Sequence, residues 1–212
     1  MNRDSEKDDI MRVNEIECFL FDLGGVLVDW DGIAPLVDLT NGKLTLEQAR
    51  RFWLESAWVR KFEAGHCSPE AYAEGVVAEL ELRIEPATFL AAFYAWDKGP
   101  LPGAIELVRA LKERYHVACL SNNNVLHWSN PVLQSLTAHF DPAIASFHVG
   151  LMKPDRDIFD LAIQRIGLPP QRIVYFDDNP ECVEAARGAG LLACQAKGVD
   201  NVRARLAVLL KE

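Results

Sequence analysis

A single stretch near the N-terminus, CFLFDLGGVLVDWD at residues 18–31, constrains the fold more than any other part of the chain. Its apolar run stops at Asp22, and Gly24 and Gly25 follow before hydrophobic residues resume. An apolar run bounded in this way is typical of a fully buried strand in a parallel sheet. Because ligands of open parallel sheets bind beyond the carboxyl ends of the strands, we expect Asp22 to point into a ligand-binding crevice. Taken by itself, the stretch is equally compatible with an aspartate that only caps a glycine turn.

Predicted strands and helices alternate along most of the chain, with a helical insertion after the first strand. Residues 32–100 carry apolar residues at helical spacing, and the capping box of Thr45 and Gln48 predicts a helix from 45 to about 61. Helices and strands alternate in the second half, where one helix is predicted near 125–138. This rhythm predicts an α/β protein with a Rossmann-like parallel sheet core and helices on both faces.

The insertion divides the chain into three predicted parts. We expect a polar N-terminal tail at residues 1–15, an α/β core formed by residues 16–31 and 101–212, and an inserted α-helical cap at residues 32–100. A length of 212 residues, half of them apolar, is enough to bury such a core. A cap at this point can close over the crevice, so we expect it to determine which substrate is accepted.

Composition limits the partners that the chain is expected to have. The net charge is −9 and Lys and Arg do not cluster, which argues against nucleic acid or a membrane surface as a partner. The five cysteines are scattered without a CxxC spacing, so neither a disulfide framework nor a zinc site is predicted. Residues 1–15 are too polar for a secretory signal. We therefore expect a cytoplasmic protein, monomeric or homodimeric, that acts on a small molecule.

Three further apolar runs stop at polar residues that could meet Asp22 at one edge of the sheet. Ser121 follows HVACL, Lys153 stands in GLMKPD, and Asp177 and Asp178 follow RIVYF. A strand-end carboxylate can take up a phosphoryl group, a fixed lysine can neutralise phosphate oxygens, and paired carboxylates can hold Mg²⁺. Each feature also has a plain structural explanation. Serine is common in loops, a lysine is usually a surface group, and one aspartate can cap the next helix.

Taken in order, the four motifs resemble the haloacid dehalogenase superfamily over residues 16–200. The segments DLGGVLVD, FEAGHCS, LSNNN, MKP and FDDN are similar to its subfamily I with a helical cap, and within it to the branch of alpha-D-glucose-1-phosphate phosphatases. The resemblance implies a haloacid dehalogenase-like hydrolase, specifically a Mg²⁺-dependent phosphatase that forms an aspartyl-phosphate on Asp22.

The resemblance also implies a role for each motif residue. Asp22, Ser121 and Lys153 would be catalytic. Phosphate would be bound by Gly24, Gly25, Ser121, Asn122 and Lys153, and Mg²⁺ by Asp22, the carbonyl of Gly24, Asp178 and, through a water molecule, Asp177. The substrate would be a small phosphorylated metabolite, with sugar phosphates as the favoured class.

Position 24 departs from the pattern of most phosphatases in this superfamily. They carry a second aspartate two residues after the nucleophile, which protonates the leaving group and then activates water, whereas this chain has Gly24. Such acid–base help is worth about 10²- to 10⁴-fold in rate. Asp29, Asp31, His66 or solvent could replace it, and His66 is attractive because histidine titrates near neutral pH. The plain structural alternative is that His66 is a loop residue and that Asp29 and Asp31 are polar surface or helix-cap residues.

Two other functions stay open on the sequence. The 2-haloacid dehalogenases of the same superfamily also lack the second aspartate, but they have a serine pair where this chain has FDDN, and halide displacement needs no Mg²⁺. A non-catalytic module that binds a phosphate ligand or a partner would explain Gly24, although it would have no need of Asp22, Lys153 and Asp178. The intact acidic pair at 177 and 178 favours the phosphatase.

Overall fold

A five-stranded parallel sheet forms the centre of the molecule. The computed structural model describes residues 16–210, so the predicted polar tail at residues 1–15 lies outside the described residues. The strand order is β5-β4-β1-β6-β7, and every neighbouring pair is parallel. The strands are β1 (Cys18–Phe21), β4 (His116–Ser121), β5 (Ala143–Ala145), β6 (Ile173–Asp177) and β7 (Leu192–Gln195). The predicted α/β class with a parallel sheet core is confirmed.

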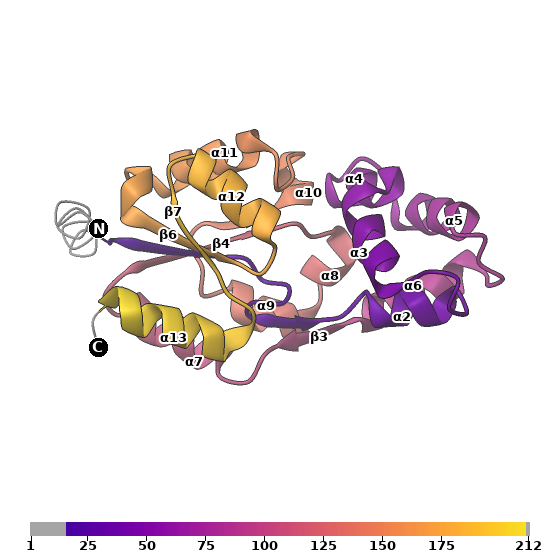
Figure 1. The fold of residues 1–212 in the computed structure, drawn as a ribbon, viewed down its shortest axis with the longest axis horizontal. Helices are drawn as coiled ribbons and strands as arrows, with labels where there is room; N and C mark the ends of the chain where they lie inside the picture. Colours follow the sequence, from indigo (N-terminus) through magenta and orange to yellow (C-terminus); the bar gives the residue numbers. More distant parts are fainter. Residues whose placement is uncertain (1–15, 211–212) are drawn as a thin grey trace, which may run out of the picture.

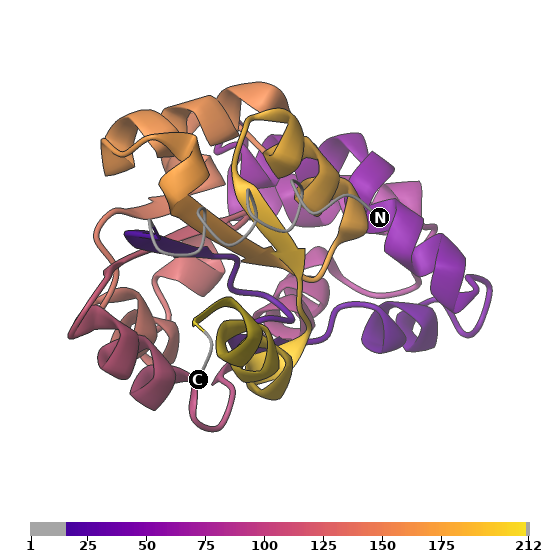
Figure 2. The same ribbon diagram turned by 60° about the vertical axis from the view of Figure 1, so that its left-hand side comes forward.

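Helices cover both faces of this sheet, as Figures 1 and 2 show. Side chains of a strand point alternately to its two faces, so β1 supplies Phe19 and Phe21 to one core cluster and Cys18 and Leu20 to the other. All four side chains are buried, which explains the uninterrupted apolar run. The covering helices are α7 (Ala104–Lys112), α9 (Pro131–Thr137) and α13 (Gly198–Leu210) on the first cluster, and α11 (Arg156–Ile166) and α12 (Pro180–Gly188) on the second.

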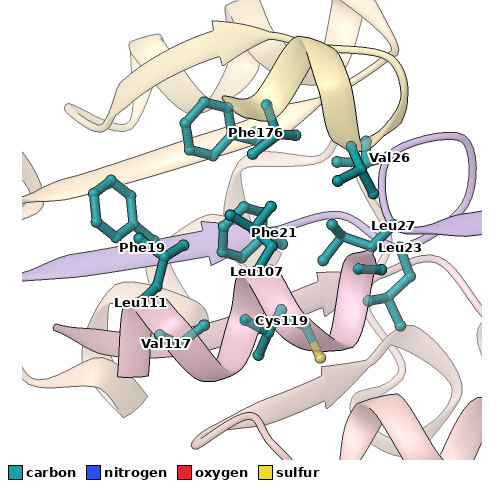
Figure 3. Close-up of a cluster of buried hydrophobic side chains, with 14 of the residues drawn as sticks. Phe19, Phe21, Leu23, Val26, Leu27, Leu107, Leu111, Val117, Cys119 and Phe176 are labelled. Atoms are coloured by element: carbon teal, nitrogen blue, oxygen red, sulfur yellow. The ribbon is translucent and has the colours of Figure 1, made fainter. Parts of the chain in front are cut away.

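The first cluster holds the carboxyl end of β1 in place (Figure 3). Phe21 and Phe176 are register partners on β1 and β6, and their rings stack with centroids 5.3 Å apart. Leu107 of α7 and Leu23 from the loop after β1 belong to the same cluster. Asp22 therefore stands between two anchored apolar residues, which fixes its backbone at the edge of the sheet.

A second group of helices lies beside the carboxyl edge of the sheet and has its own apolar core (Figure 1). An antiparallel pair of short strands, β2 (Val28–Trp30) and β3 (Asp97–Pro100), leads into and out of it. Its helices are α2 (Ala34–Leu39), α3 (Leu46–Glu55), α4 (Ala57–Glu63), α5 (Pro69–Glu79) and α6 (Pro86–Ala95). We propose that these helices, which we call the helical cap, form the substrate-covering unit; its predicted limits at 32 and 100 stay a prediction.

Aromatic rings fill the core of the helical cap. Phe62 and Tyr72 stack with centroids 4.3 Å apart, and Phe89 and Phe93 stack at 6.0 Å. Tyr72 and Phe89 are fully buried. The numerous aromatic residues of this segment are therefore mainly core, because rings spaced along a helix line up on its inner face.

Two helices predicted as continuous are each broken in two. The predicted helix from 45 to about 61 ends at Ser56, whose extended backbone and side-chain hydroxyl cap the next helix by accepting a hydrogen bond from the Val59 N–H. The predicted helix near 125–138 is split into α8 (Val125–Trp128) and α9. Asn130 caps α9, and Pro131 occupies its first position. Local capping by serine and asparagine outcompetes continuous apolar periodicity at both points.

The remaining elements are short. They are α10 (Ser146–Val149) after β5 and a 3₁₀ turn, η1 (Pro170–Arg172), before β6. Within residues 16–210, no helix has the length and apolar character needed to cross a membrane.

Candidate active site

Three carboxylates meet at the carboxyl edge of the sheet. Asp22 and Asp177 follow the register partners Phe21 and Phe176, and the Asp22 N–H donates a 2.8 Å hydrogen bond to the Phe176 carbonyl. Asp178 comes next in the chain, and ligand oxygens of the three aspartates all lie within 4.8 Å of one another. The parallel register of β1 and β6 thus brings together residues that are 155 positions apart in the sequence.

Lys153 provides the cation of this site. Its Nζ lies 2.8 Å from Asp22 Oδ1 and 2.7 Å from Asp177 Oδ2, and it donates to the Tyr175 hydroxyl at 3.0 Å. The Lys153 side chain is only 3% exposed, so the ion pairs are shielded from water. The Tyr175 hydroxyl also donates to Asp177. The ammonium group is held at a fixed point between the two carboxylates.

The loop after β4 holds Lys153 from the other side. Asn122 Oδ1 accepts from the Lys153 N–H at 2.8 Å, and Asn122 Nδ2 donates to the Lys153 carbonyl at 2.9 Å. Both amide atoms of Asn122 are therefore used within the protein, and a contact of this residue to phosphate would come from its backbone. Ser121 is buried at the end of β4 and lines the same cavity as Asp22.

Burial and like charges raise the proton affinity of the carboxylates. Burial raises the pKa of Asp22 to about 7; Asp177 and Asp178 raise it as well, while the Lys153 ammonium lowers it. Burial and the Asp177 charge also raise the pKa of Asp178. Burial disfavours the charged form of Lys153, but Asp177 and Asp22 outweigh it and raise its pKa well above the ordinary value. Lys153 pairs with Asp22 and Asp177, and the Lys197 charge acts on Asp178, so the three carboxylates outnumber the nearby ammonium groups.

This donor set fits Mg²⁺, which prefers carboxylate oxygens and keeps several of its waters. Asp177 is the least available of the three, because Oδ1 accepts from the Asn179 N–H and Oδ2 accepts from Lys153 and Tyr175. Asp178 makes no such side-chain hydrogen bond within residues 16–210. Direct coordination therefore suits Asp22 and Asp178, and contact through a water molecule suits Asp177.

The two glycines after Asp22 differ in their surroundings. A Cβ at Gly25 would lie 2.6 Å from Asp178 Oδ2, and the residue has a φ of +72°. Only glycine allows this turn to approach the carboxylate so closely. A Cβ at Gly24 would meet nothing nearer than the Trp30 Cβ at 3.9 Å. Position 24 thus has room for a side chain that this protein does not carry.

A cavity of about 640 Å³ opens over the strand ends and is shared by the sheet edge and the helical cap. Asp22, Lys153 and Asp178 line it from the sheet side. Its other walls are mixed: polar and charged side chains alternate with an apolar set that includes Val28, Trp30, Ile33, Trp53, Phe93 and Leu101. A cavity of this size accommodates a small organic molecule that presents a charged group to the strand ends.

The structure places the predicted substitutes for the missing acid in different surroundings. Asp29 and Asp31 line the cavity, but Asp29 pairs with Lys98 at 3.9 Å, and Asp31 Oδ1 caps α2 by accepting from the Ile33 N–H. His66 is exposed and is absent from the cavity wall. The structure therefore does not bring His66 to the site, because the chain turns away from the cavity after the end of α4.

Cap residues that sequence reasoning missed do reach the cavity. Glu63, the last residue of α4, lines it, as do the buried Asp97 and His127. His127 Nε2 lies 2.9 Å from the Phe93 carbonyl, so this ring fastens α8 to α6. The FEAGHCS segment contains both Glu63 and His66, and its local sequence does not indicate which of the two faces the cavity.

The fold and the site define a class of protein, and comparison with known proteins identifies the family. Residues 16–190 match the model of the haloacid dehalogenase-like hydrolases, and the chain belongs to that family. The resemblance noted in the sequence is thereby confirmed at the level of the superfamily. The chain is 27% identical over 189 residues to a phosphatase of Mycobacterium tuberculosis, covering 84% of this chain and 86% of that protein.

One further relative and one structural neighbour come from Bacteroides thetaiotaomicron. The chain is 25% identical over 209 residues to a D-ribitol-5-phosphate phosphatase, covering 92% of this chain and 98% of the relative. A crystal structure of a haloacid dehalogenase family enzyme in complex with magnesium and inorganic phosphate has a TM-score of 0.65 to this structure. That likeness extends over 86% of this chain and 94% of the other at 21% identity, and it shows a shared fold.

Proposed function

We propose that this hydrolase is a Mg²⁺-dependent phosphoric monoester hydrolase that acts through an aspartyl-phosphate on Asp22. The observation that carries the proposal is the position of the Lys153 ammonium, 2.8 Å from Asp22 Oδ1 at the edge of a three-carboxylate cluster. A nucleophilic carboxylate beside a fixed cation and a metal-binding set is the arrangement that phosphoryl transfer requires.

Each residue of the site has a part in the proposed reaction. An Asp22 oxygen attacks phosphorus in line with the leaving oxygen, and the P–O bond to the leaving group breaks. Lys153 stabilises the charge on the phosphoryl oxygens. The Ser121 hydroxyl lines the cavity and donates to the Asn122 carbonyl at 3.3 Å, and in the proposed reaction it would turn to donate to a phosphoryl oxygen. Bound Mg²⁺, held by Asp22, Asp178 and the Gly24 carbonyl, would supply positive charge to the phosphate and offset the repulsion among the carboxylates.

The relatives support the same reaction class. Two of them are named as phosphatases, one with D-ribitol 5-phosphate as its substrate, and a structural neighbour was crystallised with magnesium and inorganic phosphate. We infer a small phosphorylated metabolite as the substrate, with sugar phosphates as the first class to test. The apolar walls contributed by Trp30, Trp53 and Phe93 make phosphates of aromatic or aliphatic alcohols the second class.

The dehalogenase alternative has less support from the site. Displacement of a halide needs neither a metal nor a pair of acidic residues after β6, whereas here Asp177 and Asp178 are both present and cluster with Asp22. Halide release from 2-haloacids is therefore the comparison assay, and we expect it to be negative.

The test is release of phosphate from a panel of sugar phosphates, nucleoside monophosphates, alkyl phosphates and para-nitrophenyl phosphate, with and without Mg²⁺. Wild type should turn over members of the panel only with the metal. Asp22→Asn should lower kcat by at least about 10⁴-fold, because it removes the nucleophile. Asp38→Asn, which changes an exposed carboxylate on α2, is the matched control and should keep full activity.

Two results would overturn the proposal. Metal-dependent turnover that persists in Asp22→Asn would rule out an aspartyl-phosphate on Asp22 as the intermediate. Absence of turnover on every member by wild type would remove the phosphatase, and halide release or ligand binding would then become the leading alternative.

A further inference from the structure

The site described above lacks a group that can protonate an alkoxide leaving group. Gly24 stands where an acid is expected, Asp178 is assigned to the metal together with Asp22, and Lys153 and Asp177 are bound to one another and to neighbouring groups. An alkyl alcohol leaves from phosphorus slowly as the anion, so its departure calls for a proton donor within reach of the leaving oxygen. The missing donor must face the leaving group from another part of the cavity wall.

The end of α4 is attached to the catalytic loops by a hydrogen bond and an ion pair. Ser146 Oγ donates to the Glu63 carbonyl at 2.5 Å, and Ser146 Oγ in turn accepts from the Asn123 N–H at 2.9 Å. One turn earlier, Arg60 forms a 2.9 Å ion pair with Asp155, two residues after Lys153. These contacts join α4 to the loop that follows β4 and to the loop that carries Lys153.

The Glu63 side chain is directed into the catalytic cavity. It lines the same space as Asp22 and Lys153. Within residues 16–210, no hydrogen bond or ion pair occupies its carboxylate. The other cap-side carboxylates of the cavity differ in this respect, because Asp31 caps α2 and Asp97 accepts from the Gly99 N–H. A carboxyl group without a partner in a cavity wall is available to a ligand.

The charges around Glu63 suit proton transfer at neutral pH. Burial raises the pKa of Glu63 to about 7, with Lys153 lowering it, Asp22 raising it and Arg60 lowering it. On the side of α5, burial raises the pKa of the Tyr72 hydroxyl well above its ordinary value, and the Glu63 charge raises it further. Such a carboxyl group can give up a proton in one step and take one back in the next.

We propose that the Glu63 carboxyl group is the general acid and base that position 24 lacks. In the first step Asp22 forms a bond to phosphorus, the bond from phosphorus to the alcohol oxygen breaks, and the Glu63 proton moves to that oxygen. In the second step the Glu63 carboxylate takes a proton from water, which attacks phosphorus and breaks its bond to Asp22. Phosphate leaves, and Glu63 has regained its proton. This inference rests on the proposed phosphatase function.

The test uses Glu63→Gln with two probes that differ in leaving group. Butyl phosphate has a poor leaving group, and its turnover should fall by about 10²- to 10⁴-fold. Para-nitrophenyl phosphate releases a stable anion without a proton. The variant should therefore release one equivalent of para-nitrophenolate per active site in a burst at the wild-type rate. Turnover after the burst should be slow, because hydrolysis of the aspartyl-phosphate lacks its general base.

Two further variants separate catalysis from structure. Glu74→Gln removes the same charge from an exposed position of α5 and should leave both probes unaffected. Gly24→Asp places a carboxyl group where a Cβ has 3.9 Å of clearance, and in the Glu63→Gln background it should restore butyl phosphate turnover by at least 10-fold.

The outcomes distinguish the two proposals. Equal losses for butyl and para-nitrophenyl phosphate, without a burst, would assign Glu63 a structural role and overturn the inference while leaving the phosphatase intact. Unchanged butyl phosphate turnover in Glu63→Gln would do the same. Absence of turnover by wild type would overturn the phosphatase and this inference together.

Discussion

The sheet edge and the helical cap contribute to one cavity, but different kinds of bonding position their side chains. Asp22 and Asp177 directly follow register partners in two adjacent buried strands, so the backbone ladder sets their separation. Glu63 ends a seven-residue helix, and its place over the site depends on Ser146 and on the ion pair between Arg60 and Asp155. The charged groups of the core are thus fixed by backbone geometry, and the cap group is fixed by side chains.

This difference separates two requirements of the proposed reaction. Attack on phosphorus needs atoms held in a fixed geometry, which adjacent strands provide. Substrate entry requires the cap side of the cavity to move. A segment held by a few side-chain contacts can move more easily than strands held by the hydrogen bonds of a sheet. Variants in the core should therefore have large effects on both stability and rate, and variants in the contacts of the cap should have small ones.

The largest effect is expected from Lys153→Met. The change leaves Asp22 and Asp177 buried without the ammonium group 2.8 and 2.7 Å from them. Breaking a buried ion pair in this way costs about 3–5 kcal/mol in the free energy of unfolding. Loss of the charge that faces the phosphate should also lower kcat by about 10²- to 10³-fold. Urea unfolding and steady-state kinetics measure the two effects.

A matched lysine provides the control for this core variant. Lys98→Met changes an exposed residue of β3 that pairs with Asp29 at 3.9 Å, and it should alter the free energy of unfolding by less than about 0.5 kcal/mol. Equal effects of the two lysine variants would contradict the idea that the sheet edge is the strictly fixed part of the site.

A moderate effect is expected from pH in the absence of metal. Asp22, Glu63 and Asp178 have pKa values raised in the folded protein, to about 7 for the first two. Between their ordinary values and about pH 7 the folded chain therefore binds more protons than the unfolded chain. Stability is then greatest at low pH and is lost as the pH rises through this window. The melting temperature should fall by a few degrees from pH 5 to pH 8, since 1 kcal/mol corresponds to about 2–4 °C for a domain of this size.

Added Mg²⁺ and a variant assign this pH effect to the carboxylate cluster. Mg²⁺ should raise the melting temperature more at pH 8 than at pH 5, because it binds the ionised carboxylates. Asp178→Asn removes one member of the cluster and should flatten the decline. A decline that is identical in this variant and insensitive to Mg²⁺ would show that other groups cause it.

The smallest effect is expected from the ion pair that joins the helical cap to the core. The Arg60 and Asp155 side chains are 42% and 56% exposed, so the pair should contribute less than about 1 kcal/mol of coupling in a double-mutant cycle. Arg60→Gln and Asp155→Asn serve as the single variants. The exposed pair of Arg51 and Glu55 within α3 is the comparison cycle. A coupling free energy above about 2 kcal/mol would show that the cap is held as rigidly as the core, contrary to the comparison above.

Much of the fold followed from local sequence patterns. The capping box of Thr45 and Gln48 and the Ser68 cap before Pro69 start helices in the structure as expected. The breaks at Ser56 and before Pro131 were missed, because apolar spacing continues across them. Whether a serine caps a new helix or points to solvent depends on the direction of the chain, and Ser56 is held in its capping position partly by its hydrogen bond to Glu79.

The candidate site was predictable where strands end and unpredictable where helices meet them. Asp22, Lys153, Asp177 and Asp178 were selected from apolar runs, and the structure brings all four together. His66 is one candidate substitute acid on the sequence, but Glu63, three residues earlier, lines the cavity and His66 does not. The side of a helix end that faces a site depends on tertiary contacts, which a short sequence segment does not encode.

The parallel α/β core, the residues at its strand ends and the absence of a carboxyl group at position 24 follow from the sequence, because they depend on local apolar patterns and residue identity. The pairing of the charges and the cap residue that faces them depend on how the chain folds in three dimensions. The ammonium of Lys153 lies between Asp22 and Asp177 because β1, β6 and the loop before α11 converge there. The physical reason is that charge pairing depends on distances of a few ångströms between segments far apart in the chain.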